Sequence, residues 1–208
     1  MEERSPSSAA LGVALGYEPP PDHREERVWI PMGGSHRTRG LSDSQKKRLV
    51  SAVLDVRPEL QARLVLLGSD VDGLRPDERA ALRDRIAFLP AGGGLLSNLN
   101  AWENIVLPTG FHHPERLGAA AAQVAGLLRA LGADPHSLLA KLPERMTEYE
   151  KKLTGYVRIV LEKPDLILVE EARSPDSAER AGVAGFSAAY LASCPGGTFV
   201  QLEVTPDL

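Results

Sequence analysis

The sequence predicts an α/β fold with a mainly parallel central sheet, because short apolar runs alternate along the chain with segments of helical periodicity. The clearest run is Leu-Ile-Leu-Val at residues 166–169. Its unbroken apolar character is typical of a strand that is buried on both faces. Pro164 closes the helical pattern before it. With 208 residues, the chain is long enough for one domain with a substantial core.

The remaining elements follow from the same periodicities. Strands are expected at residues 12–17, 64–67, 86–89 and 198–204, with a further short strand at 28–30. Helices are expected after an N-cap at Ser42, and at residues 76–85, 100–106, 116–131, 134–140, 147–162 and 177–192. The rest of residues 22–40 is expected to form a charged loop, and residues 92–94, three glycines, a flexible turn.

Composition excludes several classes of function. The formal charge is −4 with both signs well mixed, so no basic patch for nucleic acid is expected. No run of about 18 apolar residues predicts a membrane span, and the first residues lack the basic region and cleavage pattern of a secretory signal. Cys194 is the only cysteine, which excludes an internal disulfide and fits a reducing cytoplasm.

One segment combines a strand with two carboxylates. Lys163-Pro164-Asp165 precedes the apolar run, and Glu170 and Glu171 follow it. This segment resembles the Walker B motif of ABC-transporter ATPases, in which one carboxylate holds magnesium and a second positions the attacking water. The carboxyl end of a central strand is also where an open α/β sheet presents its ligand.

Two further segments resemble the same family and lie in the matching order. Residues 95–108 contain a leucine pair and a short helix with a Glu-Asn pair, as after the family's glutamine loop. Residues 73–85 resemble the helix before that loop's strand. The resemblance implies a P-loop NTPase-like ABC ATPase core over residues 12–208, with a helical subdomain at about 95–162 and a disordered or weakly ordered segment at 1–11. It is closest to bacterial importer and lipid-trafficking (Mla-like) ATPases.

The best match to the phosphate-binding loop G-x-x-x-x-G-K-[ST] is residues 40–47. Gly40 and Lys46 match, and they are the nucleotide-binding candidates. Gln45 replaces the glycine before the lysine, and Lys47 replaces the hydroxyl that binds magnesium. Asp43 adds a carboxylate where phosphate would lie. An ordinary capped helix beginning is therefore favoured over a phosphate site, which stays the alternative.

Other family positions are also changed. The signature motif L-S-G-G-Q corresponds to Met-Thr-Glu-Tyr-Glu at residues 146–150, where Thr147 and Glu150 form a capping box that satisfies the helix's own amides. Ala91 stands at the glutamine of the glutamine loop, and Pro206 at the switch histidine.

Three further positions complete the comparison. Glu170 stands at the magnesium aspartate, and Glu171 matches the general base. Tyr17 lies where the family stacks an aromatic ring on adenine, although packing within its own strand is favoured.

Three hypotheses follow. The first is a non-catalytic subunit that needs no cofactor, lies in the cytoplasm or peripherally at the inner face of the membrane, and docks on a membrane permease or a partner ATPase, with a dimer as one arrangement. The second is a weak ATPase that uses ATP and magnesium through Lys46, Glu170 and Glu171. The third is a free soluble regulator. The first is favoured over the second, because removing single groups of this kind commonly lowers rates about a hundredfold or more.

The resemblance also predicts a docking surface. Residues 95–108 combine Leu95, Leu96 and Trp102 with Glu103, and offer no catalytic group. In the family this region lies near the surface that meets the membrane partner. Large aromatic anchors often carry much of the binding energy of such surfaces.

Overall fold

The computed structural model describes residues 12–19, 27–55, 62–171 and 177–204. The expectation for residues 1–11 and the position of Pro206 lie outside these ranges. The strands are β1 (Val13–Glu18), β2 (Val28–Pro31), β3 (Gly34–Leu41), β4 (Arg63–Leu66), β5 (Ser69–Asp70), β6 (Ile86–Leu89), β7 (Leu166–Glu170) and β8 (Thr198–Val204). The α-helices are α1 (Asp43–Asp55), α2 (Pro76–Arg83), α3 (Ala101–His112), α4 (Leu117–Ala130), α5 (Pro135–Leu139), α6 (Glu148–Leu161) and α7 (Ser177–Ser193).

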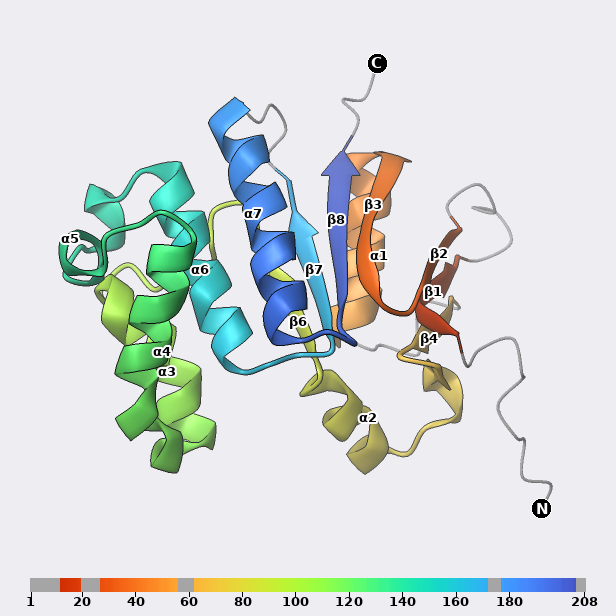
Figure 1. Ribbon diagram of the computed structural model, residues 1–208. Coiled ribbons are helices and arrows are strands. Elements are labelled where there is room, and N and C mark those ends of the chain that lie inside the picture. The colour runs from red at the N-terminus through yellow and green to blue at the C-terminus, as the bar shows by residue number, and fades with distance from the viewer. Residues whose placement is uncertain (1–11, 20–26, 56–61, 172–176, 205–208) are drawn as a thin grey trace.

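The central sheet is parallel, as predicted. Its strand order is β3-β8-β7-β6, and each neighbouring pair runs in the same direction. The side chains of β7 alternate between two cores: Leu166 and Leu168 face one, Ile167 and Val169 the other, and all four are 0% exposed. Helix α1 covers one face of the sheet, whereas α6 and α7 cover the other (Figure 1).

Strand β3 is the main difference from the expected fold, because its residues were expected to form a charged loop. Its sequence, GSHRTRGL, has no apolar alternation. The strand lies at the edge of the sheet, so it pairs only with β8, and polar side chains are tolerated on an edge. Partners from β8 bind them: Arg37 Nε donates to Gln201 Oε1 (2.8 Å), and Thr38 Oγ1 donates to the Gln201 carbonyl (3.2 Å).

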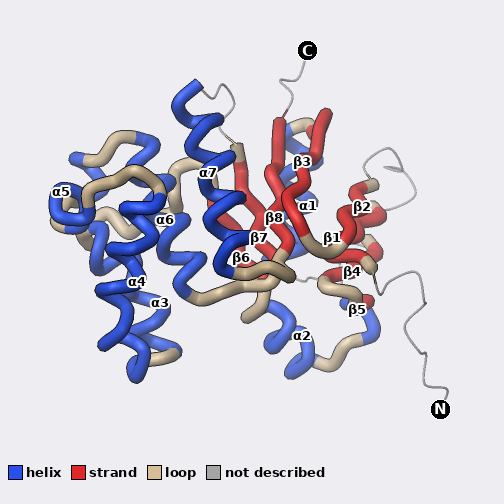
Figure 2. Tube along the Cα trace, viewed as in Figure 1, coloured by secondary structure: helices blue, strands red, loops and turns tan. Residues whose placement is uncertain are grey.

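A second, antiparallel sheet has the order β2-β1-β4-β5 and packs into the core that contains α1 (Figure 2). Helices α3 to α6 gather at the opposite end of the molecule (Figure 1). Buried residues of α3, α4 and α6 join those of α7 in a single core. Within the described ranges, no helix is long and apolar enough to cross a membrane.

Candidate functional site

The carboxyl end of β7 carries an ion-pair network. Glu170 is the last residue of β7, and its carboxylate binds Lys46 Nζ from α1. Its other oxygen, Oε2, accepts a hydrogen bond from the Ala91 backbone N–H at 3.1 Å. Lys46 Nζ also lies 3.3 Å from Asp43 Oδ1, and the lysine is only 8% exposed. The ammonium of Lys46 is therefore held between two carboxylates of its own chain.

The beginning of α1 is closed by its own side chains. Ser42 Oγ accepts from the Gln45 N–H at 3.2 Å, and Gln45 Oε1 accepts from the Ser42 N–H at 2.6 Å. This reciprocal pair is a capping box, and it confirms the predicted N-cap at Ser42. The side chains of Gln45 and Ser42 thus each satisfy one backbone donor at a position where a phosphate loop would offer such donors to an anion.

Glu171, the expected general base, is paired as well. It follows β7 directly and is 8% exposed. The Arg37 guanidinium lies 3.3 Å from Glu171 Oε1, and the Glu171 N–H donates to the Leu202 carbonyl at 3.2 Å. Sequence reasoning missed Arg37, because it lies on the strand that was expected to be a loop. Assigning β3 correctly would have placed Arg37 next to β8 and within reach of the ends of the strands.

The turn expected at residues 92–94 is present, and it packs closely against α6. Gly93 has a φ of +77°, and a Cβ there would lie 2.2 Å from the Lys151 carbonyl oxygen. A Cβ on Gly155 would lie 2.2 Å from the Gly93 oxygen. Arg158 donates to the carbonyls of Gly94 (2.9 Å) and Gly93 (3.1 Å), and burial lowers the pKa of its guanidinium. Glycine is therefore needed at positions 93 and 155, because a Cβ at either position would collide with the backbone of the other segment.

The beginning of α6 confirms the predicted capping box. Thr147 Oγ1 accepts from the Glu150 N–H at 3.1 Å, and Glu150 Oε2 accepts from the Thr147 N–H at 2.9 Å. Glu150 also binds Lys141 Nζ at 2.6 Å. Desolvation raises the pKa of Glu150, but the bonds from Lys141 and Thr147 outweigh it, so the pKa lies below its ordinary value. Tyr149 stacks on Phe186, with ring centres 6.1 Å apart.

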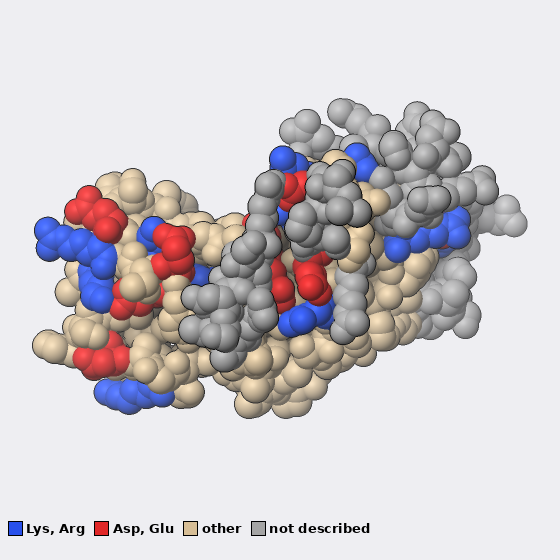
Figure 3. Space-filling view, turned by 90° about the horizontal axis from the view of Figure 1, so that it is seen from above, with Lys and Arg blue, Asp and Glu red and all other residues tan. Residues whose placement is uncertain are grey.

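Viewed from above, toward the carboxyl ends of the parallel strands, acidic and basic side chains lie next to one another (Figure 3). This pairing of opposite signs agrees with the ion pairs Lys46–Glu170 and Arg37–Glu171. The described part of this face is therefore not a field of one sign that would attract a highly charged anion.

The chain is similar to ATP-binding proteins of transport systems. It is 30% identical over 159 residues to the ergothioneine transport ATP-binding protein EgtV of Helicobacter pylori, a match that covers 76% of this chain and 71% of that protein. The lipoprotein-releasing system ATP-binding protein LolD of Novosphingobium aromaticivorans is 30% identical over 133 residues, which cover 64% of this chain but only 58% of LolD. No family model matches.

The chain belongs to the family of ABC-transporter ATP-binding proteins. Solved structures agree on the fold. CbiO1 of Clostridium perfringens, part of an ABC transporter complex, superposes with a TM-score of 0.71 over 93% of this chain and 79% of that chain, at 14% identity. The ATP-binding cassette MJ0796, solved as a dimer with ADP and phosphate, has a TM-score of 0.64 at 18% identity. The P-loop NTPase-like ABC core is thereby confirmed.

The family implies ATP and magnesium, and in this chain the corresponding positions make contacts with the chain's own residues. Lys46, which would meet phosphate, is bound by Glu170 and Asp43. An anion placed about 4 Å from either carboxylate would be repelled by roughly 4 kcal/mol at an effective dielectric near 20. The first turns of α1 and α6 are already capped. Gly40 has a φ of +75°, which suits a turn. The second glycine of the phosphate-loop pattern is absent, because Gln45 stands at its position.

Tyr17 does not offer a surface for adenine. The ring is 2% exposed and belongs to the core between the antiparallel sheet and α1. Backbone pairing with β2 and β4 holds β1 in the sheet, and the side chain of Tyr17 is buried on the face that packs against α1. This burial supports the packing alternative over the expected adenine-stacking role.

The expected docking segment at residues 95–108 of this ABC-family chain is partly exposed. Leu96 is 48% exposed and Glu103 is also exposed, whereas Leu95 and Trp102 are half-buried against the core of α3, α4 and α6. Trp102 is thus partly accessible to solvent, and the rest of its side chain packs against the core.

Sequence reasoning did not identify Asn104, a buried residue that fixes the loop before α3. It is 0% exposed, and its side chain holds the loop before α3. Asn104 Oδ1 accepts from the Leu96 N–H at 2.8 Å, and Nδ2 donates to the carbonyls of Leu96, Leu99 and Asn100. The Glu-Asn pair of the sequence signalled the family, but the role of the amide depends on a backbone path that no local pattern reveals.

Proposed function

We propose that this chain is a non-catalytic, ABC-type ATP-binding-domain-like subunit of a transport system. The observation that carries the proposal is the position of Lys46, whose ammonium is bound by Glu170 and Asp43. A lysine that neutralises two internal carboxylates is not available to a nucleotide phosphate. Releasing it would leave two partly buried carboxylates without their partner, which is costly.

The weak-ATPase alternative requires several changes together. Lys46 would have to leave its two carboxylates, Arg37 would have to release Glu171, and the capping boxes of α1 and α6 would have to open. Each reciprocal cap contributes about 1 kcal/mol, so the closed arrangement resists opening at several independent points. This cost supports the non-catalytic proposal over the alternative.

The closed sites also bear on assembly. If ATP-binding subunits of this family share each nucleotide between one subunit's phosphate loop and the other's signature helix, an intact partner would complete neither site with this chain. Residues 40–47 lack the second glycine, and residues 146–150 lack both glycines. We infer a scaffolding or regulatory role within the assembly.

The proposed docking surface is the segment at residues 95–108, on the helical subdomain that we infer for about residues 95–162. Its support is the exposed leucine at position 96, the half-buried Trp102 and the fixed loop geometry that Asn104 imposes. A rigid, partly apolar surface loses little conformational entropy on binding. The partner is a membrane permease or an intact ABC ATPase, which places the chain in the cytoplasm at the inner face of the membrane.

The substrate class follows only by analogy. LolD is named for lipoprotein release, EgtV for ergothioneine transport, and MetN of Desulfitobacterium hafniense, 25% identical over 148 residues, for methionine import. The match to LolD supports a lipid-linked system, in keeping with the likeness to lipid-trafficking ATPases.

The catalytic half of the proposal is tested by ATP turnover. The wild-type chain, alone and with any co-purified partner, is compared with Glu171→Gln and Lys46→Met. The proposal predicts that neither substitution changes turnover, because neither residue acts on nucleotide in this chain. A loss of tenfold or more in either variant, with folding intact, would establish the weak ATPase instead.

The docking half is tested by co-purification from native membranes. The matched variants are Trp102→Ala, Glu103→Lys and, as a control away from the segment, Arg129→Gln in α4. We expect the first two to lose partner recovery and the control to retain it. Retention by all three would exclude this surface. A wild-type chain that stays soluble and recovers no partner would favour the free regulator.

A further inference from the structure

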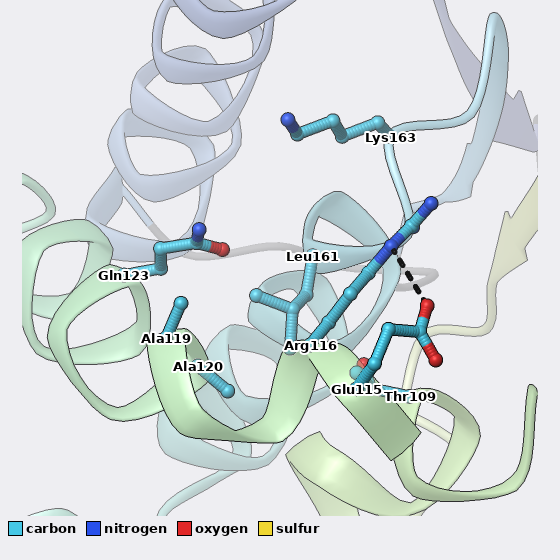
Figure 4. A pocket seen from close by; sticks show the side chains of 8 residues that line it. All are labelled: Thr109, Glu115, Arg116, Ala119, Ala120, Gln123, Leu161 and Lys163. Carbon is cyan, nitrogen blue, oxygen red and sulfur yellow. Dashed lines mark ion pairs between the residues drawn. The ribbon is translucent and has the colours of Figure 1, made fainter. Parts of the chain in front are cut away.

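A pocket lies on the helical side of the molecule, near the amino end of β7. Its volume is about 410 Å³, and it is lined by residues of α3 and α4, by Glu115 and Arg116 just before α4, by the end of α6, and by Lys163 (Figure 4). Known small-molecule sites range from about 300 to 1,000 Å³. The pocket is separate from Lys46 and Glu170 and from the docking segment, so it belongs to neither of the roles proposed above.

Two cations border this pocket. Arg116 precedes α4, and Lys163 follows the C-cap of α6 (Figure 4). Within the described ranges, the side chain of Lys163 has no hydrogen bond or ion pair. Arg116 forms an exposed ion pair with Glu115, with Nε 3.8 Å from Oε1, a distance too long for a hydrogen bond (Figure 4). The guanidinium therefore keeps its donors available for an incoming acceptor.

The backbone at Lys163 gives a second observation. Its φ is +55°, in the left-handed region that favours glycine after a helix. A lysine there is conformationally less favourable than glycine. Strained positions of this kind concentrate at functional sites. The strain places a long cationic side chain beside the pocket without a carboxylate to bind it, which is consistent with a ligand as its partner.

The remaining lining residues define what the ligand must carry. Gln123 adds an amide that can donate or accept, while Leu161 and Ala120 form an apolar wall. Thr109 is 2% exposed, and its hydroxyl binds Glu162, so the Glu162 carboxylate already has a donor. Glu115 is at the exposed rim and faces His113 Nδ1 at 3.6 Å as well as Arg116.

We propose that this pocket binds a small organic oxyanion, a carboxylate or a phosphate monoester that carries a short apolar group. Arg116 and Lys163 would bind the oxyanion, because charge-assisted hydrogen bonds are the strong ones in such sites. Gln123 would fix its orientation, and the apolar group would lie on Leu161 and Ala120. The ligand would join the end of α6 to the beginning of α4.

The test is a titration of the full chain with phenyl phosphate and with benzoate, followed through backbone amide signals in NMR. Benzamide, which has the shape of benzoate without its charge, is the matched neutral probe. We expect saturable shifts at residues 116–123 and 161–163 for at least one anion, and none for benzamide. Absence of saturable shifts with both anions, or equal shifts with benzamide, would overturn the proposal.

Variants separate the pocket from general surface charge. Arg116→Gln and Lys163→Gly should each weaken binding about tenfold or more. Lys163→Gly is informative because glycine suits the backbone at this position, so a loss of binding cannot come from a loss of folding. Arg129→Gln removes an exposed cation from the same helix but outside the pocket, and should change affinity less than twofold. Equal weakening by Arg129→Gln, or none by the two pocket variants, would overturn the site.

Discussion

The two ends of β7 show two different uses of a lysine. At the carboxyl end, Lys46 is 8% exposed and binds Glu170 and Asp43. Near the amino end, Lys163 is exposed, and no carboxylate among the described residues pairs with it. The match to the phosphate-loop pattern marked Lys46 as the binding candidate. The surroundings reverse that ranking, because Lys46 is held by two carboxylates of its own chain, whereas Lys163 has none among the described residues.

The largest expected effect concerns the loop after β6, whose Ala91 N–H binds Glu170 and which packs against α6. Gly155→Ala would bring a Cβ to 2.2 Å from the Gly93 backbone oxygen. Overpacking usually costs about 1–3 kcal/mol, and a backbone obstacle belongs at the upper end. We expect a loss of about 3 kcal/mol in the free energy of unfolding, measured by urea denaturation. Gly126→Ala, on α4 with open space around it, is the control and should be neutral or slightly stabilising.

The same substitution at both lysines tests the comparison directly. Lys46→Met leaves Glu170 and Asp43 facing each other without a cation, and we expect it to destabilise the fold by about 2 kcal/mol. Lys163→Met breaks no internal pair, so the expected change is within about 0.5 kcal/mol. Both are measured by chemical denaturation. Equal losses would show that the two regions do not differ in the way described.

A smaller effect is expected at the beginning of α6. Thr147→Ala removes the acceptor of the Glu150 N–H, and N-cap losses of this kind cost about 1 kcal/mol. Ser97→Ala, in an exposed position with no cap to lose, serves as the control. If the two variants have the same melting temperature, the cap does not stabilise this helix.

The smallest effect is a dependence of stability on acid. The pKa of Glu150 lies below its ordinary value of 4.5: desolvation opposes this shift, and the bonds from Lys141 and Thr147 outweigh it. Because the folded pKa is lower than the unfolded one, this carboxylate stabilises the fold above about pH 4.5, and the contribution is lost as pH falls through the folded pKa. Lys141→Met should raise the pKa, as seen in a carboxyl NMR titration. An unchanged titration would show that Lys141 is not responsible.

Much of the fold could be predicted from the sequence. The apolar composition of residues 166–169 predicted a buried strand. Ser42 and Thr147 predicted the beginnings of two helices, because each starts a local capping pattern. These features depend on neighbours within about four residues, so the sequence contains them.

The misses depend on distant partners. Strand β3 carries polar residues that become acceptable only next to β8: Arg37 and Gln201 are 164 residues apart along the chain. Likewise, the backbone of Ala91 binds Glu170 across 79 residues. Asn104 and the glycines at 93 and 155 act through backbone contacts of this kind, which no periodicity encodes.

The central claim is that the nucleotide position is closed by the chain's own residues. Thermal unfolding in millimolar Mg-ATP, against magnesium alone, tests it most directly, because a ligand at 100 times its dissociation constant stabilises a fold by about 2.7 kcal/mol. We predict no change in the melting temperature of the wild type. A clear rise that disappears in Lys46→Ala, measured against that variant's own baseline, would contradict the claim and establish Lys46 as a phosphate ligand.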